Sequence, residues 1–389
     1  MVKKAKIEIG AILIFIMIIF LVLFFVTYPG DIEIVLDKTY GGLSNEDGWF
    51  VLTNDGQGCL IAGYTESFGE GKKDIWILKI DENGQEVWNK TYGGEKSDTS
   101  KAISNAEEDS YLILGSTNSY GLENSNMWLI KIDEEGEEIW NKTYGNNGWE
   151  EGASIIQTED EGYILVGSTS SYGAGSDDVW AIKIDSYGAE QWNFTFGGSQ
   201  RDVGRSIDIS EEGYAIGGTT SSYGAGQDDM WLIKIDKNGN EKWNKTFGTE
   251  NNERCNQVIS TSNSIILVGH AINNDNMWNA FVVNANLDGE QQWTKTIEKN
   301  EETGFSSCIE EENGYIITGH KGSYGKQQDL MLIYIDNSGN IIWEYILDKD
   351  FGNAGVWIDN CQDSQFYVTG YSDNNGDESY DLWFLKAKI

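Results

Sequence analysis

The chain has 389 residues and a formal net charge of -36 at pH 7, with 27 Lys+Arg against 63 Asp+Glu. This balance, without a basic run beyond the N-terminus, excludes nucleic acid as a partner, because phosphate backbones need a basic surface. Hydrophobic residues make up 39% of the chain, so a large core can be buried, and 46 glycines against one proline indicate turns built on Gly, Asn and Asp.

The first element is an apolar segment within residues 1–30. Lys3, Lys4 and Lys6 precede the uncharged run AILIFIMIIFLVLFFVTY. Burying the apolar side chains of this run in a bilayer is favourable by roughly 4–8 kcal/mol. No small-residue cleavage site follows, so we expect an uncleaved signal-anchor in the cell membrane, with residues 31–389 outside the cell. The alternative is a secreted protein released by signal cleavage.

Residues 31–389 form a repeat. One tryptophan of the repeat recurs about every 50 residues, at Trp88, Trp140, Trp192, Trp243, Trp293 and Trp343. A period of this size means that each unit is one supersecondary element, which buries its apolar face only against its neighbours.

Each unit contains four short segments with the pattern of strands. In one unit they read GASIIQT (152–158), YILVGST (163–169), DVWAIKID (178–185) and EQWNFTF (190–196). They alternate apolar and polar residues, are rich in β-branched and aromatic side chains, and show no helical stripe. Four antiparallel strands, repeated radially, predict the blade of a β-propeller.

The number of copies predicts seven blades. The second strand ends at a glycine seven times, at Gly63, Gly115, Gly167, Gly218, Gly269, Gly319 and Gly370. The chain begins on a fourth strand, IEIVLDKTYGG, and ends on a third strand, YDLWFLKAKI. We therefore expect residues 32–40 to complete the last blade, because that blade would otherwise expose an unpaired edge.

Residues that recur in every blade are interpreted as structural. Third strands carry Trp76, Trp128, Trp180, Trp231, Trp278 and Trp383, and they begin with Asp74, Asp178, Asp229, Asp329 and Asp381, or with Asn126 and Asn276. Because a ligand site would break the symmetry, we expect the tryptophans to pack blade against blade and the Asx residues to cap loops.

Parts of the repeat resemble known propeller families. The turn D-x-x-G-x-x-x-W, as in DENGQEVW, resembles the tryptophan-docking motif of quinoprotein (PQQ-type) propellers, one residue shorter, and is loosely similar to the Asp-box of sialidases. The order of apolar strand, glycine, Asp-ended strand and Trp resembles kelch repeats. WD repeats fit less well, because Gly269-His270 and Gly319-His320 match their G-H dipeptide but no W-D follows. These resemblances cover residues 31–389 and imply architecture rather than activity.

A candidate ligand-binding arc comes from one position that does not repeat. The residue after the second-strand glycine is Ser or Thr in blades two to four, but Tyr64, His270, His320 and Tyr371 in the other four. These four blades are neighbours once the ring closes, and large amphipathic side chains anchor interfaces. The alternative is drift in the terminal repeats, and a metal shared by the two histidines is disfavoured.

Three further features have competing interpretations. Asn89, Asn141, Asn193 and Asn244 head N-x-T sequons, which are either glycosylation sites or simply part of the repeat. Cys59, Cys255, Cys308 and Cys361 are either buried thiols or include one disulfide. The loops GAGSDD and GAGQDD are either solvated turns or weak calcium sites, and we expect no other cofactor or metal.

For the function, our first hypothesis is a non-enzymatic binding or adhesion scaffold for a surface protein or a glycan. The alternative is a propeller enzyme, either a quinoprotein-like oxidoreductase or a carbohydrate-active hydrolase or lyase. The chain lacks the adjacent cysteines of many quinoproteins, and its arginines are Arg201, Arg205 and Arg254 alone. An enzyme should have a deep channel mouth with unlike titratable groups, and a scaffold a shallow polar face.

Overall fold

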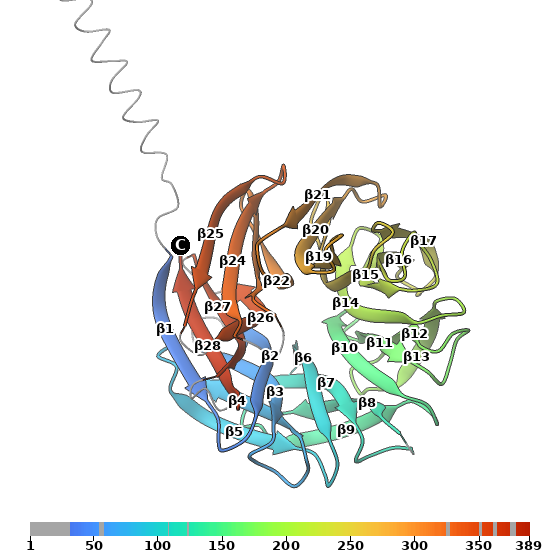
Figure 1. Cartoon of the computed structure of the whole chain (residues 1–389). Coiled ribbons are helices and arrows are strands. Elements are labelled where there is room, and N and C mark those ends of the chain that lie inside the picture. Colours follow the sequence, from blue (N-terminus) through green and yellow to red (C-terminus); the bar gives the residue numbers. More distant parts are fainter. Residues whose placement is uncertain are drawn as a thin grey trace, which may run out of the picture.

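The computed structural model describes residues 32–53, 58–107, 109–122, 124–323, 327–349, 352–360, 364–373 and 379–389. Within these residues, 28 β-strands form seven four-stranded antiparallel sheets around a central axis (Figure 1). The predicted all-β, seven-bladed propeller is therefore confirmed. No helix in the described part of the chain is long and apolar enough to cross a membrane. The predicted signal-anchor, residues 1–30, lies outside the described residues.

Six blades use their strands in sequence order from the axis outward, and the seventh uses the last three strands of the chain followed by the first. The innermost strands are β2 (Glu46–Thr53), β6 (Asp98–Ala106), β10 (Glu150–Gln157), β14 (Asp202–Ser210), β18 (Glu253–Ser260), β22 (Thr303–Glu311) and β26 (Asn353–Asn360). The second strands are β3 (Cys59–Thr65), β7 (Ser110–Thr117), β11 (Tyr163–Thr169), β15 (Gly213–Thr220), β19 (Ile265–Ile272), β23 (Gly314–Lys321) and β27 (Gln365–Ser372).

The two outer strands complete each blade. The third strands are β4 (Asp74–Ile80), β8 (Asn126–Ile132), β12 (Asp178–Ile184), β16 (Asp229–Asp236), β20 (Trp278–Ala285), β24 (Asp329–Asp336) and β28 (Asp381–Lys388). The outermost strands are β5 (Glu86–Tyr92), β9 (Glu138–Tyr144), β13 (Glu190–Phe196), β17 (Glu241–Phe247), β21 (Gln291–Ile297), β25 (Ile341–Leu347) and β1 (Glu33–Tyr40).

The ring closes as the sequence predicts. The N-terminal strand β1 pairs antiparallel with the C-terminal strand β28, with Thr39 opposite Trp383 (Figure 1). Asp37 of β1 accepts a hydrogen bond from the Trp383 indole at 2.8 Å. Tyr40 donates to the carbonyl of Gly84 in the first blade at 2.8 Å. The two ends of the chain thus complete one sheet and join it to the next blade.

Tryptophans of the outermost strands dock on the following blade. A Cβ built on Gly188 would lie 3.0 Å from the Trp140 ring, and one on Gly289 would lie 2.6 Å from the Trp243 ring. Both glycines have positive φ, 74° and 77°, in the D-x-x-G turn and its N-x-x-G counterpart. Only a residue without a side chain meets both demands, so the repeated turn is a socket for the repeated tryptophan. The predicted blade-to-blade role of these tryptophans is confirmed.

Three third-strand Asp residues, Asp74, Asp178 and Asp229, accept hydrogen bonds from the loop before them, as predicted. Asp178 accepts hydrogen bonds from the backbone N–H groups of Ala174 and Gly175, at 2.9 and 2.8 Å. In the fifth blade, the predicted assignment of Asn276 and Trp278 to the repeated positions of the third strand was wrong. There the register places Phe281 opposite Gly269 and Asn279 opposite Ala271, so that these residues, not Trp278 and Asn276, take the repeated positions.

Candidate functional site

Every innermost strand contains a β-bulge at the same place. On β14 the register shifts between Gly204 and Ser206, which leaves Arg205 without a partner on β15. A bulge inserts one residue and re-aims its side chain. The seven bulge residues all differ and all line one cavity on the axis: Trp49, Lys101, Ala153, Arg205, Asn256, Ser306 and Val356.

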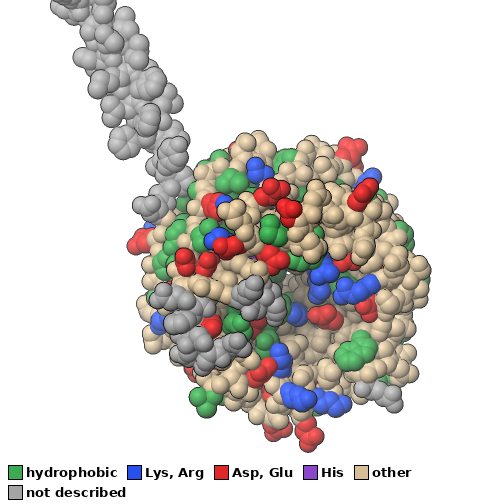
Figure 2. All heavy atoms as spheres, viewed as in Figure 1, with side chains coloured by type: hydrophobic (Ala, Val, Ile, Leu, Met, Phe, Trp, Pro, Cys, Tyr) green, Lys and Arg blue, Asp and Glu red, His purple; other side chains and the backbone are tan. Residues whose placement is uncertain are grey.

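This cavity, which we call the channel mouth, has a volume of about 660 Å³. It opens on the face where innermost strands begin and second strands end, and Figure 2 shows Lys and Arg side chains around the central hollow. A second cavity of about 450 Å³ lies farther along the axis. Trp357 lines both cavities, so the two are neighbouring parts of one channel.

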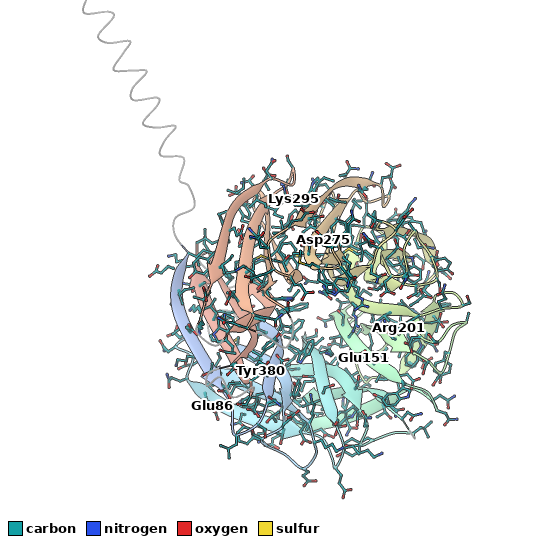
Figure 3. All side chains as sticks on the ribbon, in the orientation of Figure 1. Glu86, Glu151, Arg201, Asp275, Lys295 and Tyr380 are labelled. Carbon is teal, nitrogen blue, oxygen red and sulfur yellow. The ribbon has the colours of Figure 1, made fainter. Side chains whose placement is uncertain are left out.

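Three cations line the channel mouth. Arg205 approaches Glu151 with an N–O distance of 3.8 Å, and Arg254 pairs with Asp228 at 3.0 Å. The Nζ atom of Lys101 lies 3.0 Å from the centroid of the Trp49 ring, a cation–π contact. Glu151, labelled in Figure 3, comes from β10 beside the central opening. Cations from blades two, four and five therefore converge on one space in a strongly acidic chain.

Burial shifts the pKa values of two groups beside the mouth. It lowers the pKa of Lys101 to about 8, partly offset by the charge of Glu151. It raises the pKa of the Asp47 carboxyl to about 7, although Lys101 and Lys73 act in the opposite direction. One Asp47 oxygen, Oδ1, has no hydrogen-bond partner among the described residues. Both groups therefore change charge near neutral pH.

Aromatic side chains form the other part of the wall. Trp49, Trp278, Trp357 and Tyr371 line the mouth. Trp357 stacks on Phe50 with ring centroids 4.2 Å apart, and the Tyr371 hydroxyl donates a hydrogen bond to Gln328. These contacts hold the rings in place while leaving part of each facing the cavity.

The structure brings together three of the four residues of the predicted arc. His270, His320 and Tyr371 line the channel mouth, whereas Tyr64 does not. The Tyr64 ring lies instead under Lys73, with Nζ 3.9 Å from its centroid. Burial lowers the pKa of His270 to about 3 and that of His320 to about 4, so both imidazoles are neutral at physiological pH.

Trp278 belongs to the site rather than to the repeated frame. Its ring meets His270 edge-on at 4.6 Å, and the Arg254 guanidinium lies 5.0 Å from its centroid. Asn256 donates to the backbone carbonyl of Phe305 at 2.7 Å. The fifth blade thus contributes four side chains to the mouth.

The sequon asparagines have a structural role in the blades. Asn141 accepts a hydrogen bond from the Trp128 indole at 3.1 Å and donates to Glu138 at 2.7 Å. The same pairing with a third-strand tryptophan occurs at Asn89, Asn193 and Asn244. All four asparagines lie on exposed outermost strands. The motif is therefore part of the frame, and glycosylation stays a prediction.

The cysteines and the possible calcium-binding loop have structural positions. Cys59, Cys255 and Cys308 are buried, no disulfide joins them, and Cys361 lies outside the described residues. Burial raises the pKa of Cys255 to about 12. The Asp178 of the GAGSDD loop is occupied by backbone N–H groups. Across the described ranges, no group of three or more His, Cys, Asp or Glu side chains is placed to hold a metal ion.

Sequence reasoning missed most of the channel mouth. Lys101, Arg205 and Asn256 stand at one position of the repeat, two residues before a small or apolar residue of the innermost strand. A comparison of the seven first strands, column by column, would have shown that this position holds a different residue in every blade. The sequence thus shows that this position varies, but it does not show the β-bulge that directs the side chain to the axis.

Known proteins resemble this chain in fold only. No family profile matches its sequence, and no characterised protein matches it significantly. The WD40 domain of Pan2 from Neurospora crassa superposes with a TM-score of 0.60 and 9% identity, over 92% of this chain and 95% of that one. BBS1N, solved in complex with ARL6DN, superposes with a TM-score of 0.51 and 10% identity, over 90% of this chain and 96% of that one.

At these identities the likeness shows a β-propeller structurally similar to WD40-type propellers. Membership of the kelch or quinoprotein families receives no support from any family match. The likeness to a WD40 domain exists without the W-D dipeptide, because blade geometry depends on strand packing rather than on one motif.

Proposed function

We propose that the protein is a ligand-binding propeller that receives a glycan, or an exposed part of a surface protein, in the channel mouth. The observation that supports this most is the set of bulge residues. Seven blades built on one repeat present seven different side chains to a single cavity. Positions that only packed blade against blade would repeat, as the docked tryptophans do.

Display outside the cell is part of this proposal. The apolar run within residues 1–30, preceded by three lysines, favours an anchor with the propeller on the outer side. Proteolysis of intact cells tests it: an externally added protease should degrade the propeller without cell lysis. Complete protection until lysis would contradict external display and leave ligand binding unaffected.

A carbohydrate-active hydrolase or lyase is the second candidate. Unlike titratable groups from different blades meet at the mouth, among them Lys101, Glu151 and Glu302, and the channel continues past Trp357. Such asymmetry is the feature expected of an enzyme. Binding remains the first proposal because it requires only the cavity and its polar lining, whereas catalysis also requires a proton donor and acceptor placed on a reacting bond.

The test fills the mouth without removing any polar group. The full chain in detergent is applied to arrays of oligosaccharides and of purified surface proteins, together with an Ala153→Trp variant and an exposed control, Tyr187→Ala. Ala153 lines the cavity, while Tyr187 is 76% exposed in a turn. We expect loss of binding in Ala153→Trp alone. Equal binding by all three proteins would contradict a site in the channel, and cleavage of a bound oligosaccharide would favour the enzyme.

A further inference from the structure

We propose that the ligand of the channel mouth is a carboxylated sugar, a pyranose ring that carries a carboxylate. Its carboxylate is bound by the cations of blades two and four, and its ring lies against the tryptophans. This inference rests on the proposed binding function and specifies the chemistry of the ligand.

Most of the arginines of the chain lie at the channel mouth. The chain has a net charge of -36, yet two of its three arginines, Arg205 and Arg254, line one cavity together with Lys101. Two carboxylates, Glu151 and Glu302, line the same cavity, and Asp228 balances Arg254, so Lys101 and Arg205 are the cations left for an anion. Salt screens charges beyond about 8–10 Å, and an anion inside the mouth therefore responds to these neighbours rather than to the overall charge.

Two of these cations have unused hydrogen-bond donors among the described residues. Arg205 approaches Glu151 only to 3.8 Å, and Lys101 rests on the face of Trp49. Within the described residues neither side chain donates a hydrogen bond, although together they carry eight N–H groups. A carboxylate in the cavity would supply the missing acceptors, and a bidentate contact with Arg205 would be the strongest of them.

Arg254 differs from these two. Its guanidinium donates to Asp228 at 3.0 and 3.1 Å and lies over Trp278. Its charge is therefore balanced by Asp228, and its contact within the mouth is with the Trp278 ring. We assign the carboxylate contact to Lys101 and Arg205.

The other residues that line the mouth suit a sugar ring. A sugar ring combines apolar C–H faces with hydroxyl groups that both donate and accept hydrogen bonds. Trp49, Trp278 and Trp357 line the cavity and supply apolar ring surface. Ser306, Glu302 and the part of Asn256 not bound to Phe305 offer polar atoms among them. A volume of about 660 Å³ lies within the range of small-ligand pockets.

The experiment compares each acid with its own uncharged ester. Uronic-acid trisaccharides and their methyl esters have the same shape, but the ester carries no charge. Binding to the full chain in detergent is measured by titration calorimetry, and folding of every variant is checked by its melting temperature. We expect at least one acid to bind about tenfold or more tightly than its ester, since charge-assisted hydrogen bonds are about twice as strong as neutral ones.

Two variants and a matched control locate the contact. Arg205→Gln and Lys101→Met should each weaken binding of the acid about 10–100-fold and leave the ester nearly unchanged. Arg201→Gln removes the same charge four residues away. Arg201 pairs with Asp177 at 3.1 Å and does not line the cavity, so acid binding should be retained.

The tryptophan surface is tested separately. Trp278→Leu should weaken acid and ester by the same factor, because it removes the contact with the ring and not with the charge. Equal affinity for acid and ester, equal losses in Arg205→Gln and Arg201→Gln, or no binding of any acid by the wild-type chain would each overturn the carboxylated sugar. In each of these cases the proposed binding function would still be supported if the wild-type chain captures a ligand and Ala153→Trp does not. The two proposals are therefore tested separately.

Discussion

The outer part of each blade and the bulge on its innermost strand follow opposite rules. On the outer part the same contact recurs: Trp140 docks on Gly188, and Trp243 on Gly289. At the bulge, the seven blades present seven different residues to the axis. A residue that faces a neighbouring blade is constrained by that blade, whereas a residue that faces the channel is not. In this protein, repetition therefore marks packing, and its absence marks the surface available to a ligand.

The two cavities on the axis also differ in whether their charged side chains bond to a neighbouring blade. In the one farther along the channel, Asp208 accepts the Ser260 N–H at 2.7 Å and Asp359 accepts the Thr53 N–H at 3.0 Å. Each of these acids thus joins two neighbouring blades. In the channel mouth, Lys101 and Arg205 make no comparable bond within the described residues. Among the described residues, the mouth therefore differs in having cationic donors that are free to bind a ligand.

The largest effect is expected at the seam of the ring. Deleting residues 32–40 from the full chain removes β1, exposes the edge of β28 and breaks the contact of Asp37 with Trp383. Because an unpaired edge and its apolar face remain, we expect a loss of several kcal/mol and aggregation. Melting and light scattering measure this. Removing residues 1–29 instead should leave the melting temperature unchanged, and equal melting of both variants would contradict closure by β1.

The next prediction sets one frame tryptophan against one channel tryptophan. Trp231 is only 1% exposed in a core cluster shared by two blades, and Trp231→Ala should cost about 3–5 kcal/mol. Trp49 faces the cavity, so Trp49→Ala should cost about 1 kcal/mol or less and instead reduce ligand binding. Denaturant unfolding measures both. A larger stability loss at Trp49 would reverse the assignment of frame and site.

A smaller effect is expected at the turn socket. Gly188 has φ of 74°, and an added Cβ would lie about 3.0 Å from Trp140 and 2.9 Å from Lys142. Gly188→Ala should therefore cost about 1–3 kcal/mol. Its counterpart in the channel, Ala153→Ser, adds one atom toward open space and should stay within about 0.5 kcal/mol. Equal unfolding midpoints for these two variants would show that the turn tolerates a side chain.

The sequence predicted the frame well, because the frame is periodic. Strand identity, blade number and the closing role of residues 32–40 all followed from counting and from the edge problem. Register was lost in the fifth blade, where the loop before β20 places Trp278 three residues ahead of the repeated position that Phe281 takes. No periodicity reveals such a shift, because the displaced tryptophan still looks like its counterparts.

The candidate site was only partly predictable. The sequence grouped His270, His320 and Tyr371 with Tyr64 because all four depart from Ser and Thr in neighbouring repeats, but the structure places only the first three in the wall of the mouth. Position in the repeat did not reveal that Tyr64 lies under Lys73, since Lys73 comes from the following loop. Lys101 and Arg205 were missed because a bulge, and not the alternation of a regular strand, turns them toward the axis.

The smallest effect is expected from pH. Lys101, with its pKa lowered to about 8, loses its positive charge as the pH rises through that value, and Asp47, with its pKa raised to about 7, gains a negative charge one unit earlier. Both changes make the mouth less attractive to an anion. The affinity for a uronic acid should therefore fall about 3–10-fold between pH 6 and pH 9, while that of its methyl ester stays constant.

Variants separate the two steps of this profile. Lys101 faces Glu151, Arg205, Asp47 and Lys73, and Asp47 faces Lys101 and Lys73. The pKa shifts of Lys101 and Asp47 nevertheless arise mainly from burial. Lys101→Met should remove the fall near pH 8, and Asp47→Asn should remove the fall near pH 7. The neutral histidines, with pKa values of about 3 and 4, should contribute to neither step. A pH profile that is flat in the wild-type chain, or that persists in the Lys101→Met, Asp47→Asn double variant, would mean that neither group faces the bound anion. The carboxylate of the ligand would then be bound by Arg205 and not by Lys101.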